Sequence, residues 1–445
     1  MSFLIPLPSM SEEYMQILYR ELTINPQQRM KGRGVVRGRS NGVSTYVISK
    51  DNDGTEVVHV PLFHALHRMG LQISPSDGSD KWSSNMKFTG SLYQYQKEYA
   101  NSVVDALNSY RTTGLTLYPG AGKTTMGVAI ACQVGMVAVV LVHDKGLISQ
   151  WKMAFERRST ASVWMVGEGS APSRADVIVC LYTRTSKIPE VVRRKVGFLL
   201  VDEAHEYCNT SGAEAILDFT PHYLLALTAT WNKSNEMQKV LELFTGPPVV
   251  GALTVPFKFT KIVSSYTALR VRTANGINWS QLIQSLLYNP ARNLEIINLV
   301  KWLVEVQNRK PIVFTTEVEH VKTIHQLLRE GGISSCDWLA ENKDNYNDSL
   351  VLVGNVQKCG TGFDEEMYCS DWQGRRIDTA VLISSFREPS LLAQVIGRTF
   401  RSEDPWIYHI VDNDPTIKGH WRECHNWYLE NKGTEVGTID LNYFA

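Results

Sequence analysis

Seven short, continuous apolar runs in two series constrain the fold of this 445-residue chain more than any other feature. The first series is MVAVVLV, ADVIVCL and GFLLVDE, and the second is KPIVFT, SLVLVG, TAVLISS and WIYHIVD. Such runs, without polar alternation, are typical of parallel strands that are buried on both faces. Helical segments separate the runs, so the sequence predicts two consecutive α/β domains with parallel sheets flanked by helices.

The two series place the α/β domains at residues 86–255 and 256–420. Before them lie a helical stretch, SEEYMQILYREL, and two β-rich runs around Asp51-Asn52-Asp53-Gly54, which is a good hairpin turn. We therefore expect a small α+β N-terminal domain at 1–85. We also expect a C-terminal tail at 421–445 that packs as a helix on the second α/β domain.

Composition excludes several classes of protein. Lysine and arginine equal aspartate and glutamate at 45 each, so any binding of nucleic acid must use local patches. The seven cysteines are scattered without a CxxC pair, which favours a reducing compartment over a disulfide framework. The longest apolar run, VGMVAVVLV, is far shorter than the ~20 residues of a membrane-spanning helix. We expect a soluble intracellular protein, cytoplasmic or nuclear, with no membrane partner.

The stretch LTLYPGAGKTTMG has the pattern of a phosphate-binding loop between a strand and a helix. Its glycines would let backbone N–H groups face phosphate oxygens at the helix N-terminus. Lys123 would reach the β/γ-phosphates and the Thr124 hydroxyl would ligate Mg²⁺. Leu117 stands where the pattern GxxxxGK[ST] has its first glycine, and the alternative is a chance glycine-rich turn. The residues expected to bind nucleotide are Pro119, Gly120, Ala121, Gly122, Lys123, Thr124 and Thr125.

Two carboxylates end the apolar run FLLV, in the segment FLLVDEAHEY. Asp202 can hold Mg²⁺ through water, and Glu203 can polarise an attacking water. The alternative is a pair of solvated acids at a strand end, which the phosphate-binding pattern upstream makes the weaker interpretation.

The segment LLAQVIGRTFR carries Gln394, Arg398 and Arg401 at spacings of four and three. On a helix these three side chains would share a face. Two arginines aimed at one site suit the transition state of γ-phosphate transfer. The alternative is a solvated basic face. The segment Thr228-Ala229-Thr230 after another apolar run is weak by itself.

Taken together, PGAGKTT, VDEAH, TAT and QVIGRTFR resemble motifs I, II, III and VI of the superfamily 2 helicases, in the same order. The segments LYQYQKEYANSV, LVHDKGLISQWKMAF, VIVCLYTR, KPIVFTTEVEHVKTIHQLL and LVGNVQKCGTGFDEEM resemble the motifs before and between them. The resemblance covers about residues 88–415. It implies two tandem RecA-like domains, with Gln96 contacting adenine and Asp364 in the core of motif V.

The resemblance also implies the activity: a motor on nucleic acid that uses ATP and Mg²⁺, with ATP bound between its two domains. The implied catalytic residues are Lys123, Asp202, Glu203, Gln394, Arg398 and Arg401. The implied metal ligands are Thr124 and Asp202.

The pair Gln150-Trp151 is similar to a pair in XPB-like repair translocases, phage UvsW-type helicases, restriction-motor subunits and helicases of large DNA viruses. These relatives imply DNA rather than RNA as the substrate, 3′-to-5′ movement, a transcription or replication complex as a partner, and a viral or phage source. Trp151 itself is either a stacking platform for bases or a core aromatic.

Three alternatives to a DNA helicase stay open at this point. They are a translocase that remodels nucleoprotein complexes without processive unwinding, an RNA helicase, and a binding protein with a degenerate site. Two segments depart from the family pattern: Trp231 follows TAT where proline is frequent, and the stretch after Asp364 is long and polar. The segment QQRMKGRGVVRGRS either contacts phosphates or is a solvated loop; its basic residues are Arg29, Lys31, Arg33, Arg37 and Arg39.

Overall fold

A computed structural model describes residues 2–25, 42–50, 53–72, 80–169, 172, 174–231, 238–251, 255–273, 276–339, 347–356, 365, 369, 371–387 and 389–444. The chain divides into two compact units. The first unit is Met1–Leu117 with Gly122–Gly251, and the second is Ala252–Ala445 with the short segment Tyr118–Ala121. The basic segment at 29–39 lies outside the described residues, so its role stays a prediction.

Within the described part of the first unit, seven parallel strands form a sheet in the order β12-β6-β11-β10-β7-β9-β8. All residues of β7, β9 and β10 are buried, which confirms the strands predicted from the first series of apolar runs. The strands are β6 (Thr112–Thr116), β7 (Ala138–Val142), β8 (Val163–Met165), β9 (Val177–Leu181), β10 (Phe198–Val201), β11 (Tyr223–Thr228) and β12 (Val249–Val250).

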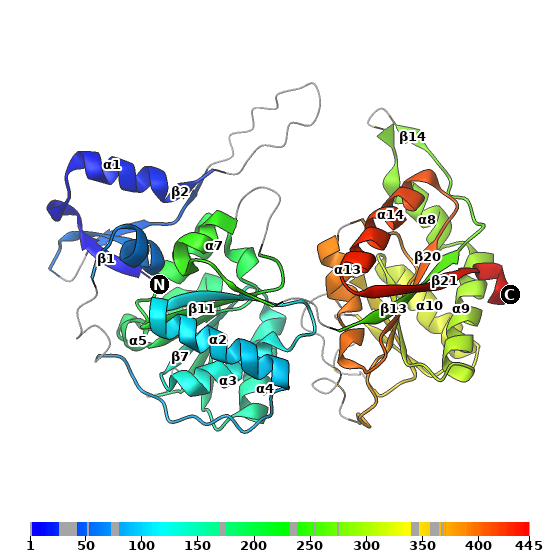
Figure 1. The fold of residues 1–445 in the computed structure, drawn as a ribbon, viewed down its shortest axis with the longest axis horizontal. Coiled ribbons are helices and arrows are strands. Elements are labelled where there is room, and N and C mark those ends of the chain that lie inside the picture. Colours follow the sequence, from blue (N-terminus) through cyan, green and yellow to red (C-terminus); the bar gives the residue numbers. More distant parts are fainter. Residues whose placement is uncertain are drawn as a thin grey trace. The chain divides into compact units, whose positions relative to one another are not determined.

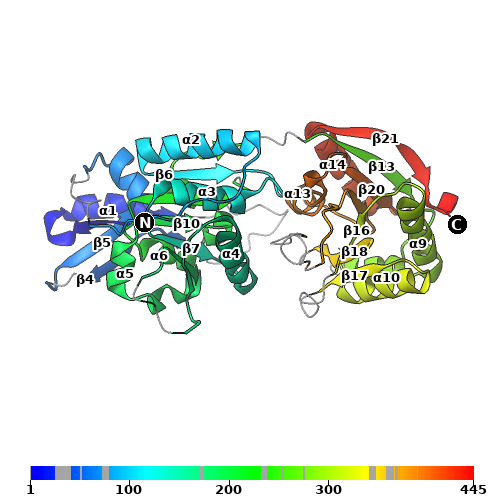
Figure 2. The ribbon, with the colours of Figure 1, turned by 90° about the horizontal axis from the view of Figure 1, so that it is seen from below.

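Helices alternate with these strands along the chain, as expected for parallel connections. Helix α3 packs between α2 and α4, and these helices also contact strands of the sheet (Figures 1 and 2). The helices are α2 (Gln94–Tyr110), α3 (Lys123–Val134), α4 (Lys145–Arg158), α5 (Glu190–Lys195), α6 (Thr210–Leu217) and α7 (Gln238–Thr245).

The N-terminal residues form a small α+β region. Helix α1 (Glu12–Glu21) begins at Ser11, whose hydroxyl accepts a hydrogen bond from the N–H of Tyr14. Strands β4 (Val47–Lys50) and β5 (Glu56–Pro61) pair as the predicted antiparallel hairpin, and β1 (Ser2–Pro6) pairs with β5. The hydrophobic core of this region includes Leu243 of α7, so the region belongs to the first compact unit. Short strands β2 (Thr23–Ile24) and β3 (Val43–Ser44) also pair.

The second unit repeats the architecture. Among its described residues, seven parallel strands have the order β17-β18-β16-β19-β20-β13-β21. The predicted strands of the second series are all present. The strands are β13 (Phe257–Val263), β16 (Pro311–Thr315), β17 (Ser335–Trp338), β18 (Val351–Asn355), β19 (Thr379–Leu382), β20 (Trp406–Val411) and β21 (Gly433–Asp440).

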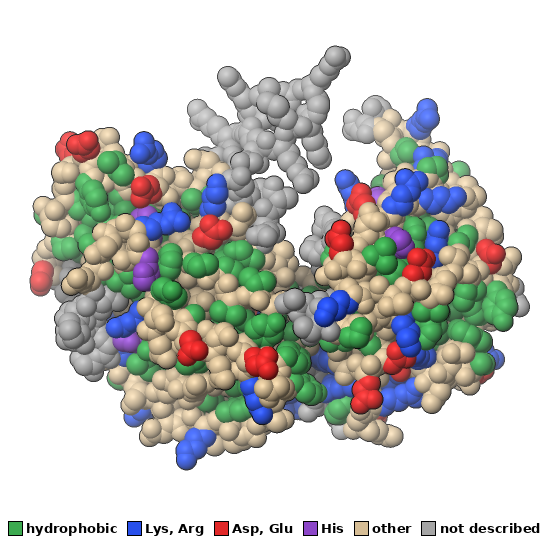
Figure 3. Space-filling model, in the orientation of Figure 1, with side chains coloured by type: hydrophobic (Ala, Val, Ile, Leu, Met, Phe, Trp, Pro, Cys, Tyr) green, Lys and Arg blue, Asp and Glu red, His purple; other side chains and the backbone are tan. Residues whose placement is uncertain are grey.

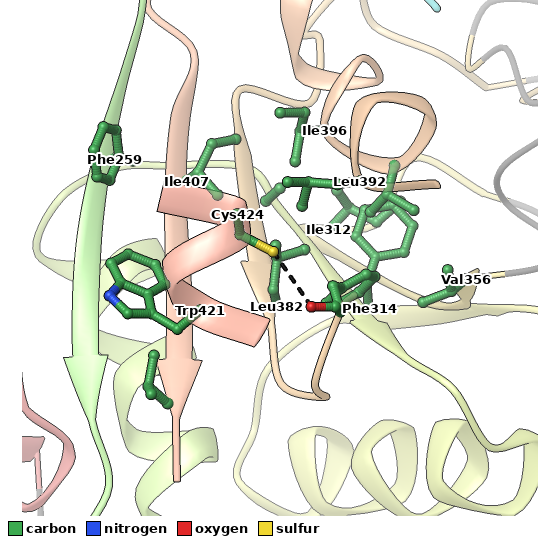
Figure 4. Packing of buried hydrophobic residues seen from close by; sticks show 14 of the residues in the cluster. Phe259, Ile312, Phe314, Val356, Leu382, Leu392, Ile396, Ile407, Trp421 and Cys424 are labelled. Carbon is green, nitrogen blue, oxygen red and sulfur yellow. Dashed lines mark hydrogen bonds between the residues drawn. The ribbon is translucent and has the colours of Figure 1, made fainter. Parts of the chain in front are cut away.

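One hydrophobic cluster of the second unit joins strands of the sheet to α8, α13 and α14, and another joins them to α9 and α10. Figure 4 shows part of the first cluster, where Phe259, Leu392 and Trp421 come from three different elements. The Cys424 thiol in this cluster donates to the carbonyl of Phe386. The helices are α8 (Trp279–Leu287), α9 (Pro290–Glu305), α10 (Val318–Glu330), α13 (Pro389–Ile396) and α14 (Pro415–Glu430), and the pair β14 (Arg272–Thr273) and β15 (Gly276–Ile277) precedes α8.

The C-terminal residues differ from the expectation of a helix alone. Helix α14 is followed by β21, which adds an edge strand beside β13, and by a short 3-10 helix at Leu441–Phe444. The domain boundaries at 85, 255 and 420 stay predictions. Within the described ranges, every helix is too short or too polar to cross a bilayer.

Candidate active site

The phosphate-binding pattern lies between strand β6 and helix α3. Gly120 and Gly122 have φ angles of 87° and 82°, in the left-handed region that glycine adopts without strain. A Cβ atom on Gly122 would collide with the Gln96 side chain, so the loop and the predicted adenine-contacting residue are neighbours. Lys123 is half-buried, and its Nζ donates to the carbonyl of Leu117 at 3.3 Å.

The two carboxylates follow β10, whose position in the sheet places them close to this loop. Asp202 is buried, and its pKa is raised to about 7, first by that burial and second by the charge of Glu203. The Lys123 charge acts in the opposite direction on the same carboxyl, so the structure brings together the predicted phosphate and metal ligands.

Glu203 occupies a strained position. Its φ of 46° lies in the left-handed region, which is uncommon for a residue with a side chain and costs on the order of 1–3 kcal/mol. Its Oε2 is buried and accepts no hydrogen bond from any described residue; Nδ1 of His205 lies 3.5 Å away. A buried carboxylate oxygen without a donor fits a site that receives a water or ligand.

Motifs II and III are joined by a hydrogen bond. Nδ1 of His205 lies 2.9 Å from Oγ1 of Thr228, at the end of β11. The same Thr228 oxygen accepts from the N–H of Thr230 at 3.0 Å and donates to its carbonyl. Sequence analysis gave His205 no role and found the segment Thr228-Ala229-Thr230 to be a weak motif by itself. The reason is that contacts between neighbouring strand ends are not visible in a linear pattern.

Trp231 has a packing role that accounts for its departure from the family pattern. The ring is buried and lies directly over Gly114 of β6, where a Cβ atom would collide with it. The side chain therefore completes the core of the first unit.

Trp151 is not a stacking platform. Its side chain is fully buried in α4, and its indole N–H donates to Oδ2 of Asp202 at 2.7 Å. Of the two alternatives, Trp151 is therefore a core aromatic. It also makes a polar contact that the sequence did not indicate.

The arginine segment of the second unit is not one continuous helix, so the expectation of a shared helical face is wrong for Arg401. Helix α13 ends at Ile396, and Arg401 lies in a 3-10 helix at Thr399–Arg401. The Thr399 hydroxyl donates to the carbonyl of Ile396 at 2.7 Å, which competes with the next helical hydrogen bond. Gln394 lies in α13, and Arg398, which is buried, comes between the two helices in the sequence. Asp364 lies outside the described residues.

The long polar stretch after motif V folds back on the second unit, as far as its described residues show. Glu365 is buried and accepts hydrogen bonds from the N–H of Ile377. The Lys310 ammonium lies 3.4 Å from Glu365 and also contacts Asp348. These polar side chains are thus paired within the unit.

Two parallel sheets in tandem, the first with a glycine-rich phosphate loop beside strand-end carboxylates, define an ATPase with two RecA-like domains. Residues 89–233 match the protein family described as "Type III restriction enzyme, res subunit". The chain is 24% identical over 377 residues to "Putative helicase 161L" of Invertebrate iridescent virus 6, covering 78% of this chain and 83% of the relative.

A second relative is the "General transcription and DNA repair factor IIH helicase/translocase subunit XPB" of Dictyostelium discoideum, 25% identical over 62% of this chain and 38% of that protein. A solved structure, "S. cerevisiae Dbp5 bound to RNA and ADP BeF3", matches 76% of this chain and 89% of its own with a TM-score of 0.53 at 12% identity, which shows the shared fold. The chain is a superfamily 2 helicase or translocase: an enzyme that binds nucleic acid and hydrolyses ATP.

Proposed function

We propose that ATP and Mg²⁺ bind at the phosphate loop that precedes α3. Lys123 contacts the β/γ-phosphates, Thr124 and Asp202 hold the metal ion, and Glu203 polarises the attacking water. The metal ion would neutralise charge that develops on the phosphates. The single observation that carries this proposal is Glu203, a carboxylate on a strained backbone whose buried Oε2 has no hydrogen-bond donor among the described residues.

The roles of the remaining site residues rest on the motif resemblance. Gln96 contacts the adenine, and the backbone from Pro119 to Thr125 surrounds the phosphates. Arg398 and Arg401 stabilise the charge of the transition state, with Gln394 and Asp364 contributing to the same site. Their joint action would tie hydrolysis to changes between the two domains.

The preferred substrate in this proposal is DNA. The support is the Gln150-Trp151 spelling and the likeness to the XPB subunit, whose printed name includes DNA repair. Because Trp151 is buried, this support comes from sequence similarity to relatives and not from a contact with a base. On the face shown in Figure 3, basic and acidic side chains are interspersed, so local phosphate contacts are expected to carry binding.

The test is the rate of ATP hydrolysis with single-stranded DNA, duplex DNA and RNA as separate stimulators, in the wild type and in Lys123→Ala, Glu203→Gln and Glu214→Gln. The exposed Glu214 of α6 is the matched control for Glu203. We expect stimulation by DNA above that by RNA, no turnover in the first two variants, and wild-type turnover in the control. Lys123→Ala should also weaken ATP binding, whereas Glu203→Gln should keep bound ATP.

Substantial turnover in both Lys123→Ala and Glu203→Gln would contradict the site. A rate that no polynucleotide changes would contradict the motor, and a clear preference for RNA would reverse the substrate. Strand displacement from a forked duplex then separates a helicase from a translocase that moves on nucleic acid without unwinding it.

A further inference from the structure

The contact between Trp151 and Asp202 joins two motifs that are 51 residues apart. Trp151 lies in α4, the helix of motif Ia, whereas Asp202 follows β10 in motif II. An indole N–H can only donate a hydrogen bond. Here it donates to Oδ2 of Asp202, and it holds that oxygen without adding charge.

A glycine of the neighbouring helix leaves room for the Trp151 ring. Gly127 lies inside α3, the helix that follows the phosphate loop, where glycine costs about 1 kcal/mol relative to alanine. A Cβ atom on Gly127 would lie 2.8 Å from the Trp151 ring and 3.1 Å from Leu200. The absence of a side chain at 127 lets the indole lie against α3, so it contacts the phosphate-loop helix and the metal-binding carboxylate at once.

The carboxylate needs this donor. Asp202 is 6% exposed, and a buried carboxylate without hydrogen bonds is strongly disfavoured. With Oδ2 held by the indole, we expect the carboxylate to present its other oxygen, Oδ1, to the metal ion of the proposed site. Groups that orient a metal ligand in this way typically change metal affinity by about 10- to 100-fold when they are removed.

We propose that Trp151 is a positioning residue for ATP hydrolysis, which holds the carboxylate of Asp202 in the orientation that binds the metal ion. This inference rests on the proposed function for the role of Asp202. It assigns Trp151, a residue of motif Ia, to the ATP site through its contact with Asp202. It also explains a tryptophan at this position without any contact to nucleic acid.

The first test compares Trp151→Phe with Trp164→Phe. Trp164 is the matched control, because its indole N–H donates to a backbone carbonyl, that of Glu168, at 3.3 Å. We expect Trp151→Phe to raise the Mg²⁺ concentration for half-maximal ATP hydrolysis about tenfold or more. In Mg²⁺ it should weaken binding of a non-hydrolysable ATP analogue by a similar factor, and in EDTA that binding should stay within about twofold of wild type. Trp164→Phe should change none of these values.

The second test needs no activity and no metal. In protein with ¹⁵N-labelled tryptophan, one indole N–H resonance should disappear in Trp151→Phe, and the same resonance should shift strongly in Asp202→Asn without Mg²⁺. If Trp151→Phe does not fold, 3-benzothienylalanine at position 151 replaces the N–H by sulfur in a ring of the same shape, and it should reproduce the Mg²⁺ effect.

A variant that loses thermal stability while its Mg²⁺ dependence stays unchanged would show that Trp151 only fills the core, and would overturn the proposal. An indole resonance that ignores Asp202→Asn would do the same. Failure of the proposed function has another signature: Lys123→Ala and Glu203→Gln would then retain turnover, whatever Trp151→Phe does.

Discussion

The two units share one architecture but treat buried charge in opposite ways. In the second unit, Arg292 is 1% exposed and donates through Nε and Nη2 to Asp412, at 2.8 and 2.9 Å. The same guanidinium donates to the carbonyl of Ile383, and the Ser264 hydroxyl donates to Asp412 at 2.6 Å. Here the buried guanidinium and carboxylate are paired with each other within the unit.

In the first unit, by contrast, we propose that the carboxylates after β10 serve a ligand. Asp202 has a neutral donor, Trp151, and Glu203 has a buried oxygen with no donor among the described residues. The comparison teaches that a parallel sheet determines where polar groups gather, whereas the partners of those groups decide between stability and chemistry. Four predictions test this difference.

The largest expected effect concerns Arg401, a charge of the second unit that we assign to chemistry. Arg401→Ala should lower kcat by a factor on the order of 10³–10⁵ and leave ATP affinity nearly unchanged, because the charge acts on the transition state. Arg401→Lys should restore activity only in part, since an ammonium group lacks the planar guanidinium fork. The measurements are kcat and nucleotide Kd with saturating nucleic acid.

The control for Arg401 is Arg329→Ala on the exposed surface of α10. It should leave both constants unchanged. An Arg401→Ala enzyme that loses ATP affinity but keeps kcat would place this arginine in ground-state binding, and one that keeps both would place it outside the site.

The second prediction breaks the buried pair of the second unit. Asp412→Ala should lower the free energy of unfolding by about 3–5 kcal/mol, because it leaves the Arg292 guanidinium buried without a carboxylate. Denaturant unfolding measures this loss. The double variant Arg292→Met with Asp412→Leu removes both charges and should be much less destabilised. Equal losses in the single and double variants would show that packing, and not charge, holds this region.

The third prediction uses two buried histidines of the second unit. Burial lowers the pKa of both His320 and His409 to about 3, so both are neutral in the folded protein. The unfolded chain takes up protons below pH 6.5, which favours unfolding as the pH falls. At pH 5 this linkage should cost about 2 kcal/mol for each histidine relative to pH 7.5.

The measurement is denaturant unfolding at pH 7.5 and pH 5, for the wild type and His409→Gln. The variant should lose about 2 kcal/mol of the difference between the two pH values, whatever its stability at pH 7.5. The control is His425→Gln, because His425 is only half-buried and lies beside Glu435. A difference that His409→Gln leaves intact would contradict the assignment of a neutral buried histidine.

The smallest expected effect compares one helix cap from each unit. Asn209 accepts from the N–H of Gly212 at the start of α6, and Asn289 accepts from the N–H of Arg292 at the start of α9. Each change to alanine should cost about 1 kcal/mol in thermal or denaturant unfolding. A clearly larger loss for Asn289→Ala would show that the cap also holds Arg292 in its buried pair.

The sequence by itself indicated seven strands of the two sheets, the phosphate loop and the superfamily. Buried parallel strands need uninterrupted apolar residues, so GFLLVDE and KPIVFT indicated their strands directly. The loop was equally visible, because only glycine adopts the φ angles of Gly120 and Gly122 without strain. These features depend on residues that are close together in the chain.

Tertiary structure decided what depends on partners far apart in sequence. The indole of Trp151 meets Asp202 only because α4 packs against α3 and β7, and Lys310 meets Glu365 only across the second unit. Strand β21 escaped recognition because an edge strand with alternating exposed residues carries no continuous apolar run, and its place is set by pairing with β13. A pattern of residue types reports burial and backbone conformation, whereas the partner of a polar side chain is chosen by the packed fold.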